Sequence, residues 1–430
     1  MTSRATTILL LLLPACTALA QDSLSLTALQ ASAVHHDPRG REVELLTEQS
    51  RLRQRNLDAE RRPTLSLQGQ AQYQSSVTTI PIVLPGGQSV PVPAHDTYDA
   101  HLAAQQPMYD PSLAPRRAVE DAQLAESRAR LRVALFGVRQ AVNDLYFTAL
   151  RTQSQLAELS TTITDIEAQR HVAEARVREG AALPSEESAL RAELLRRRQA
   201  EAELRATRTA TLAALSDLTH SATDSMSAFG MPQLADQVSA VRSSPADLRA
   251  RAEYEHFART RDVLARQEDA RTAADKPRIS AFGRVGYGRP GLNQLSRTFD
   301  GYYLGGVQLQ WTPFNWGATS RDREVIALQR QVVSAEEQNF TDNLRRGVTQ
   351  ELAAVDRLAA TLAMDDEIIV LRERIATEAR ARFGEGVITS AEYVDRATDV
   401  LSARTARALH RVELAQARAH FLTTLGIGVR

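Results

Sequence analysis

The chain has 430 residues, which is more than one compact domain usually contains. Its 52 basic residues balance its 52 acidic residues, so it has no overall positive field that would attract nucleic acid. Only 5% of the residues are aromatic, and a composition rich in alanine, leucine, arginine and glutamate favours long helices over β-sandwiches or doubly wound sheets.

Residues 1–20 have the pattern of a secretory signal peptide. A positive start precedes a short apolar run over residues 8–13, and residues 18–20 form a small-x-small cleavage site. The run is too short to cross a bilayer as a helix. Cleavage would remove Cys16, the only cysteine, and with it any disulfide framework. The alternative is a lipoprotein signal in which Cys16 is lipidated.

After residue 20, strand-like and helix-like patterns follow one another. No later apolar stretch reaches the ~18–20 residues that a membrane helix requires, so any entry into a membrane would have to use strands. The predicted segments are N-terminal helices (21–62), a strand pair with its loop (63–109), a long helical hairpin (110–220), a linker and helix (221–276), a second strand pair with its loop (277–314) and a second long hairpin (315–430).

The two halves of this plan also match in sequence, which indicates an internal repeat. Each strand pair opens with proline and continues with a branched apolar residue, serine, glycine and tyrosine in step. The matching segments are 63–69 and 277–283, 106–110 and 312–316, and 175–180 and 381–386. Since the matches keep one order at similar spacing, chance is a poor explanation.

The predicted strands alternate between apolar and polar side chains. In the first strand, one face carries Leu65, Leu67, Ala71 and Tyr73, and the other carries Ser66, Gln68, Gln70 and Gln72. In the last strand, Val307, Leu309 and Trp311 alternate with Gln308 and Gln310. This period is typical of a membrane barrel wall, apolar toward lipid and polar toward the lumen. The alternative is a solvated hairpin that covers a soluble core.

Four strands are too few to close a barrel, since the smallest membrane barrels have about eight. Open strand edges are not tolerated in lipid. If the strands lie in a membrane, strands from several chains must therefore combine, and the membrane interpretation predicts an oligomer.

The longest predicted helices follow the strand pairs. From Arg116 to Glu179 there is no proline, and apolar residues recur at alternating spacings of three and four, which predicts a coiled-coil helix. At 1.5 Å per residue, roughly 60–65 residues make a rod of about 90–100 Å. A similar helix is predicted from about Asp322 to Phe383.

Both long helices end at a glycine that would let the chain reverse. Gly180 and Gly386 stand where a left-handed residue commonly ends a helix. Ser185 is predicted to start the first return helix, with Glu186 in its first turn, where the helix dipole favours acids. A T-x-x-E capping box at residues 389–392 predicts the start of the second.

Partial matches to cofactor and metal motifs occur in the sequence, but their context argues against both functions. Residues 286–291 read G-x-G-x-x-G, but Arg289-Pro290 interrupts the helix that a dinucleotide site needs, so a glycine-rich loop is the interpretation. His35 and His36 are adjacent and diverge on a helix, which argues against joint metal binding. The sequence predicts no enzyme, no cofactor and no metal site.

With this order of segments, the chain resembles the TolC-like outer-membrane efflux family. The resemblance covers essentially the whole chain after residue 20 and rests on the doubled strand pair and hairpin, the matched segments and the glycine-ended turns. It implies a mainly α fold with a membrane β-barrel part. In a homotrimer, each chain would give four strands to a shared twelve-stranded barrel in outer-membrane lipid, with extracellular loops. Long antiparallel coiled-coil hairpins would form a periplasmic α-barrel.

For function, the resemblance implies an exit duct of a tripartite efflux or type I secretion system. A periplasmic adaptor and an inner-membrane transporter would deliver the substrate. The hairpin tips would contact the adaptor, and the matching residues are Gly180, Ala181, Leu183, Gly386, Val387 and Thr389.

Four residues match pore or gate positions of the family. Phe383 matches an aromatic gate position and Glu186 an acidic latch position, while Glu392 and Asp395 match acids that ring the narrow entrance. Threefold symmetry would turn each acid into a carboxylate ring, which attracts cations. Ile388 stands where a gating arginine would be expected, so this latch lacks its cation. Alternatively, Glu392 only caps its helix and Asp395 only faces solvent.

Two other functions fit parts of the sequence. A periplasmic structural coiled-coil protein would have the same helices and water-soluble strand pairs. A periplasmic adaptor would also carry a helical hairpin, but one hairpin between two halves of a small β domain, whereas this chain has two hairpins and two strand pairs.

Overall fold

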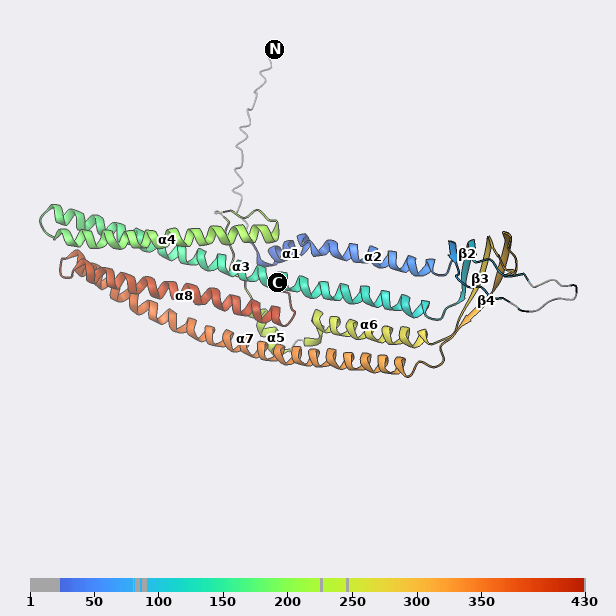
Figure 1. Ribbon diagram of the computed structural model, residues 1–430. Coiled ribbons are helices and arrows are strands. Elements are labelled where there is room, and N and C mark those ends of the chain that lie inside the picture. The colour runs from blue at the N-terminus through green and yellow to red at the C-terminus, as the bar shows by residue number, and fades with distance from the viewer. Residues whose placement is uncertain are drawn as a thin grey trace, which may run out of the picture. The chain divides into compact units, whose positions relative to one another are not determined.

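The computed structural model describes residues 24–79, 81, 86, 91–224, 227–244 and 247–428 (Figure 1). The predicted signal peptide, including Cys16, lies outside the described residues. The helices are α1 (Leu26–His36), α2 (Arg39–Ala59), α3 (Leu113–Arg178), α4 (Pro184–Thr219), α5 (Ala235–Ser243), α6 (Ala252–Ala274), α7 (Ala318–Gly384) and α8 (Ser390–Thr424), with a short 3₁₀ helix at Leu248–Ala250. The strands are β1 (Thr64–Tyr73), β2 (Asp96–Tyr109), β3 (Arg278–Arg289) and β4 (Asp300–Gln310).

These elements belong to two compact units. The hairpin unit comprises the residues up to Asp37, Gly137–Leu248 and the residues from Arg345 onward, and the sheet unit comprises Pro38–Phe136 and Arg249–Leu344. Along the sequence, α3 and α7 each contribute residues to both units. Within the described ranges, no helix is both long enough and apolar enough to cross a membrane.

The sheet unit contains an antiparallel sheet in the order β1-β2-β3-β4. The two predicted strand pairs therefore join through β2 and β3. β1 and β4 form the edges, and neither has a further partner strand among the residues that the structure describes. The backbone groups on these outer edges are thus left available to another strand.

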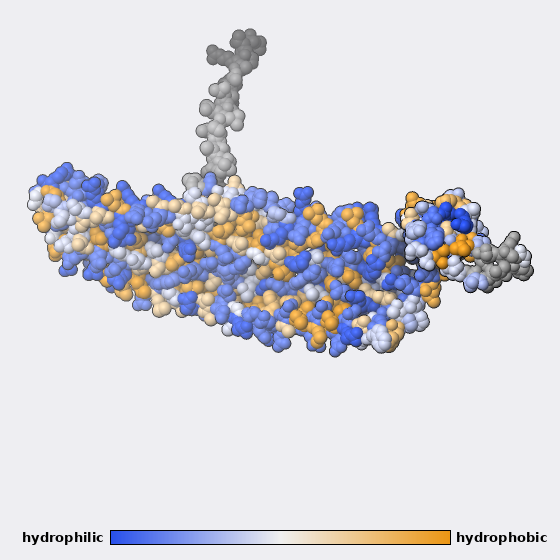
Figure 2. All heavy atoms as spheres, in the orientation of Figure 1, coloured by the Kyte–Doolittle hydropathy of each residue, from blue (hydrophilic) through white to orange (hydrophobic). Residues whose placement is uncertain are grey.

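One face of the sheet is apolar and exposed. The pairing register places four apolar side chains in one row across the strands, namely Leu67, Leu102, Val285 and Tyr303, and all four are exposed. The next row lies on the opposite face and contains Gln68, His101, Gly286 and Tyr302. In Figure 2, hydrophobic atoms gather beside hydrophilic ones on the sheet. The predicted alternation of the strands is present.

The glycine motif at residues 286–291 lies mostly in β3, which ends at Arg289, so the prediction of a loop was wrong there. The reason is a close contact across the sheet. A Cβ atom at Gly286 would lie 2.7 Å from the His101 Cβ and from the Tyr302 ring. Glycine therefore leaves room for the Tyr302 ring over β3, and the Tyr302 hydroxyl donates to Asp99 Oδ1 at 2.5 Å.

The helices of the sheet unit are α2, α6 and the first parts of α3 and α7. Arg117 of α3 pairs with Asp58 of α2 at 2.8 Å. Between α6 and α7, the hydroxyls of Tyr254 and Thr341 lie 2.9 Å apart, and the Tyr254 ring packs edge-on against Phe340 at 5.5 Å. Exposed ion pairs contribute only ~0–1 kcal/mol each, so the partly buried aromatic contact is the stronger of the two.

The hairpin unit contains two antiparallel helical hairpins that lie side by side, with both reversal turns at the same end of the unit (Figure 1). The first joins the later part of α3 to α4, and the second joins the later part of α7 to α8. Several predicted heptad positions of α3 are buried in this unit, namely Val138, Val142, Leu159, Ile166 and Ala173. The predicted long helices are present, and each begins a few residues earlier than expected.

The main core of the hairpin unit lies where the helix ends opposite the turns meet α1. Its largest buried side chains are Tyr146, Phe147, Leu215, Phe229, Leu234 and Leu422. The Tyr146 hydroxyl donates to the Gly230 carbonyl at 2.5 Å and lies 3.1 Å from the Leu24 carbonyl. Burial raises the pKa of this hydroxyl to about 12, because the phenolate would lose its hydration.

Candidate functional site at the hairpin tips

Both hairpin tips use the same glycine-based turn. Gly180 has a φ of 74° and Gly386 a φ of 76°, the left-handed conformation that the sequence predicts at these positions. The amide of Ala181 bonds to the Arg176 carbonyl at 2.8 Å, and the amide of Val387 bonds in the same way to Arg382 at 2.8 Å. These bonds satisfy carbonyl groups at the helix end, so each tip is a Schellman turn.

The two return helices begin differently. α8 begins with the predicted capping box: the Thr389 hydroxyl accepts from the Glu392 amide at 3.3 Å, and the Glu392 carboxylate accepts from the Thr389 amide at 3.2 Å. α4 begins at Pro184, after Leu183, without a side-chain cap, so the prediction that Ser185 starts this helix was wrong. Proline suits a first helical position because its φ is fixed and it has no N–H to satisfy.

The outer surface of the tips combines two exposed apolar side chains with the exposed Glu179 and Glu385. Leu183 and Val387 are 67% and 64% exposed. The remaining predicted contact residues, Gly180, Ala181, Gly386 and Thr389, are also exposed. Two protruding apolar side chains on rigid turns form a surface that a partner helix could cover.

Phe383 lies inside the tips rather than on them. Its side chain is 0% exposed and packs with Ile166, Leu190, Leu194 and Tyr393. The rings of Phe383 and Tyr393 stack at 5.2 Å, and the Arg176 guanidinium lies 5.6 Å from the Phe383 ring centre. Phe383 therefore fixes the base of the tips and does not present its ring to solvent in this conformation.

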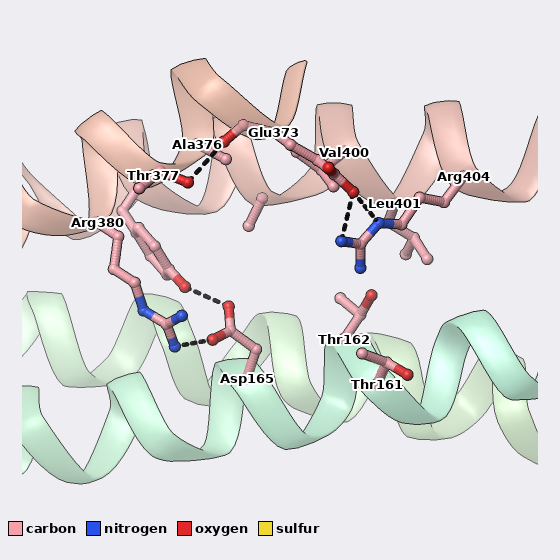
Figure 3. A pocket seen from close by; sticks show the side chains of 12 residues that line it. Thr161, Thr162, Asp165, Glu373, Ala376, Thr377, Arg380, Val400, Leu401 and Arg404 are labelled. Atoms are coloured by element: carbon pink, nitrogen blue, oxygen red, sulfur yellow. Dashed lines mark hydrogen bonds and ion pairs between the residues drawn. The ribbon is translucent and has the colours of Figure 1, made fainter. Parts of the chain in front are cut away.

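A three-residue network joins the two hairpins just below the tips (Figure 3). The Tyr393 hydroxyl of α8 donates to Asp165 Oδ2 of α3 at 2.5 Å, and the Arg380 guanidinium of α7 pairs with the other carboxylate oxygen. Burial, and after it the bond to Asp165, raise the pKa of the Tyr393 hydroxyl above its ordinary value. One carboxylate thus holds both helices of the second hairpin.

Beside this network lies a cavity of about 350 Å³ between the hairpins. Its other end is bounded by Glu373 and Arg404, which pair at 2.6 Å within the second hairpin (Figure 3). Thr161, Thr162 and Thr377 are among the further lining residues. The hairpins therefore separate beside the network, and they pack against each other again at the Phe383 cluster and in the main core.

The acidic residues of the predicted gate have separate surroundings. Glu186 is partly exposed, and no ion pair of its carboxylate occurs among the described residues, whereas its neighbour Glu187 lies 3.4 Å from Arg170. Ile388 packs against the buried Phe383 cluster. Within one chain, then, the latch position has an acid but no cation.

Glu392 and Asp395 are both exposed on the first turns of α8. Glu392 takes part in the cap, and Asp395 lies 3.5 Å from the Arg396 guanidinium. Three residues apart, the two carboxylates lie on one side of the helix. Both interpretations of Glu392 remain compatible with this geometry, because a capping carboxylate keeps its charge.

Asp165, Arg380 and Tyr393 are not among the site residues that the sequence predicts. Asp165 precedes Ile166 of the buried heptad stripe, and a charge that flanks a core position was the one available signal. Its two partners follow more than 200 positions later in the chain, so no local pattern could have identified them.

No family model matches the chain, and no curated protein matches its sequence. Solved structures match its fold. CusC, whose crystal structures concern folding and transmembrane channel formation, has a TM-score of 0.70 at 16% identity, with 94% of this chain and 93% of CusC covered. The outer membrane protein VceC of Vibrio cholerae gives 0.66 at 14% identity, with 94% and 97% covered. The open state of the MtrE outer membrane channel of Neisseria gonorrhoeae gives 0.65 at 18%, with 94% and 89% covered.

These likenesses extend over nearly the whole chain and over most of each channel protein. At such low identities they establish the fold, and the fold class expected from the sequence, a mainly α chain with long helical hairpins and four strands, is confirmed.

Proposed function

We propose that this chain is the exit duct of a tripartite efflux or type I secretion system, located in the outer membrane and extending into the periplasm. The observation that carries the proposal is the shared fold with outer membrane channels, combined with a sheet whose exposed face is apolar. The proteins that share the fold are described as channels and not as enzymes. The proposed role is to let a substrate pass without catalysing a reaction on it.

The duct wall would be built by three copies of the sheet. β1 and β4 are the outer strands, and lipid does not tolerate unpaired strand edges. Pairing of β1 in one copy with β4 in the next closes a ring of three sheets. The row with Leu67 and Tyr303 would then face lipid, and the row with Gln68 and His101 would face the lumen.

Cysteine crosslinking tests this closure directly. In one sheet, β2 and β3 separate β1 from β4, so a disulfide between a β1 cysteine and a β4 cysteine can form only between copies. We expect single cysteines along residues 64–73, combined with Val307→Cys, to give a ladder of crosslinked oligomers in outer-membrane fractions. A matched Val285→Cys partner on the inner strand β3 should give none. A monomeric, water-soluble protein without crosslinks would support the structural coiled-coil alternative instead.

The tips would dock with a periplasmic adaptor that connects the duct to an inner-membrane transporter. Support comes from the exposed Leu183 and Val387 on rigid turns. Photo-crosslinking residues at these two positions should capture one periplasmic protein in living cells, whereas the same residue at exposed Leu195 in mid-helix α4 should not. Absence of a product at both tips would contradict the docking role.

At the entrance, Glu392 and Asp395 would form rings of three carboxylates that favour cations. Closure would depend on the Asp165 network, which links the hairpins within each copy, rather than on Glu186, which has no cation partner in the described chain. Phe383 would act from inside, by holding the tips in shape.

A further inference from the structure

The first hairpin contains a cavity of its own. In the hairpin unit, about 560 Å³ of space lies between α3 and α4, which run antiparallel (Figure 1), beside the segment at Ser227 and Ala228. This cavity shares no lining residue with the one beside the Asp165 network. The lining residues recur along one face of each helix, at positions 153, 156, 157 and 160 of α3 and 201, 205, 208, 209 and 212 of α4. A space of this size can hold a small organic molecule.

The walls of the cavity combine apolar side chains with hydroxyl groups. Leu212 is buried and Leu156 is partly buried, whereas Ala157, Ser160 and Thr209 are exposed. The two hydroxyls donate to carbonyl groups of their own helices at 3.0 Å, and each oxygen can still accept a hydrogen bond. The cavity therefore opens to solvent on one side and offers an apolar surface inside.

One charged side chain of the cavity lacks an opposite charge. Glu201 and Arg205 pair at 2.6 Å. Arg208 is partly buried, and its Nη2 donates to the Ser227 carbonyl at 2.6 Å while its Nη1 lies 3.5 Å from Gln153 Oε1. Both of these partners are neutral, and within the part of the chain that the structure describes no carboxylate pairs with Arg208. Burial lowers the pKa of this guanidinium, because desolvation disfavours the charged form.

The unpaired guanidinium determines which ligand the cavity suits. A charge that is removed from water is normally paired, so Arg208 favours an anion. The guanidinium has five N–H donors in one plane, and its two neutral contacts leave others available. A planar carboxylate matches this geometry and accepts two of these bonds at once. The leucine side chains of the walls suit an apolar body behind the carboxylate.

We propose that the cavity between α3 and α4 binds a small organic carboxylate, whose charge pairs with Arg208 and whose apolar body covers Leu156 and Leu212. The site does not depend on the exit-duct role, because all of its contacts lie within the hairpin unit. Since Arg208 also holds the Ser227 carbonyl and lies 5.9 Å from the centre of the Phe229 ring, the test must separate ligand binding from support of this segment.

Equilibrium dialysis of the purified full chain in a non-ionic detergent tests the site. The probe is 2-naphthoate, a water-soluble carboxylate with an apolar ring system, and a chamber of detergent alone corrects for partition into micelles. We expect saturable binding of one molecule per chain. The neutral analogue 2-naphthamide should bind at least about tenfold more weakly, because it lacks the charge. Acetate should compete only at much higher concentration, because it lacks the apolar body.

Two sets of substitutions locate the bound probe. Arg208→Gln retains a donor for the Ser227 carbonyl and removes the charge, and it should weaken binding of 2-naphthoate at least about tenfold. The matched control is Glu201→Gln with Arg205→Gln, which removes a neutral pair from the same cavity. This control should change the affinity by less than about threefold. Equal losses in both variants would contradict the role of Arg208.

A third variant keeps Arg208 and fills the space. Ala157→Trp places a large ring in the cavity from α3 and leaves the bond between Arg208 and Ser227 in place, so it should abolish binding at an unchanged Tm. It also decides the outcome if Arg208→Gln fails to fold, because a residue that only supports the Ser227 segment would leave binding in Ala157→Trp intact. The proposal is overturned if the wild-type chain binds no 2-naphthoate above the detergent blank, or if 2-naphthamide or acetate binds equally well.

Discussion

The two helical hairpins follow the same order of elements but differ in the apolar side chains that they leave exposed. Near its turn, the first hairpin buries Ile166, Ala173, Leu190 and Leu194 against Phe383 and Tyr393 of the second, and Arg170 and Glu187 pair across it. The second hairpin has a small apolar cluster of Val355, Leu358, Leu414 and Ala417. Polar pairs cross it as well, namely Asp365 with His410, Arg372 with Asp399, and Glu373 with Arg404, each at 2.6 Å.

In the second hairpin, α7 turns apolar residues outward. Met364, Ile368, Leu371 and Ile375 are exposed and, at spacings of four, three and four, lie along one side of the helix. We call them the α7 stripe. Among the described residues of the first hairpin, the large apolar side chains that are exposed are Val172, Leu183 and Leu195, which form no such stripe. We therefore expect the α7 stripe, and not the first hairpin, to contact another chain. In the proposed trimer, a neighbouring copy would cover it.

The largest effect should come from charges in the α7 stripe. Ile368→Glu with Leu371→Glu would place two carboxylates in an apolar contact between copies, where burial of an unpaired charge is unfavourable. We expect the trimer to be lost in native mass spectrometry. Leu195→Glu in the first hairpin is the control, because a lone exposed leucine is ordinary and its loss should leave the trimer intact. If both variants lost the trimer, or if both kept it, the two hairpins would not differ in their contact with another chain.

The next effect concerns burial at the tips. Phe383→Ala should destabilise the fold by about 3–5 kcal/mol, because it leaves a cavity among the residues that join both hairpins. Val387→Ala, four residues away but exposed, should change stability by at most about 0.5 kcal/mol. Thermal unfolding of the two variants in detergent compares them. Similar shifts in Tm would mean that Phe383 is not a packing residue.

A smaller effect is expected where the hairpins meet. Asp165→Asn removes the anionic partner of Arg380 and should cost about 1–3 kcal/mol, with longer open times of single channels in planar bilayers. Glu373→Gln removes a pair within the second hairpin and should leave open times unchanged. Asp165→Asn and Tyr393→Phe should be non-additive, because both act on one network. Strict additivity would show that the two bonds are independent.

The same network predicts a pH effect. The folded pKa of Tyr393 lies above its ordinary value of 10.0, so the stability that its neutral hydroxyl contributes is complete below pH 10 and is lost as the pH rises through the folded pKa. Closure of wild-type channels should weaken in this alkaline range, and Tyr393→Phe should lack that step.

The smallest effect should distinguish the two possible roles of Glu392 at the second tip, which are capping of α8 and attraction of cations. Glu392→Gln retains a capping-box residue and removes the carboxylate, whereas Thr389→Ala removes the cap, at a cost of about 1 kcal/mol, and retains the charge. If Glu392 belongs to a cation-selective ring, only Glu392→Gln with Asp395→Asn should reduce cation preference in reversal-potential measurements. Reduced preference in Thr389→Ala alone would assign Glu392 to the cap.

Much of the fold could be predicted because its signals are local. The buried stripe of α3, the left-handed Gly180 and Gly386 and the capping box each depend on residues within a few positions of one another. The end of β4 was predicted less well. The alternation of apolar and polar residues predicts a strand as far as Trp311, but the strand ends at Gln310, because backbone pairing depends on the partner strand.

The features that sequence reasoning missed depend on contacts between distant segments. Asp165 meets Arg380 and Tyr393 only because two hairpins lie side by side. The glycine motif in β3 was assigned to a loop because glycine is common in loops, while its cause is the ring of Tyr302 on the neighbouring strand. Periodicity describes a helix or strand by itself and contains no information about such neighbours.

The crossing of Tyr302 over Gly286 has a consequence for natural variation in relatives of this chain. A methyl group at position 286 would collide with both the His101 Cβ and the Tyr302 ring, so alanine there requires both neighbours to shift. Positions 101, 286 and 302 should therefore vary together rather than independently.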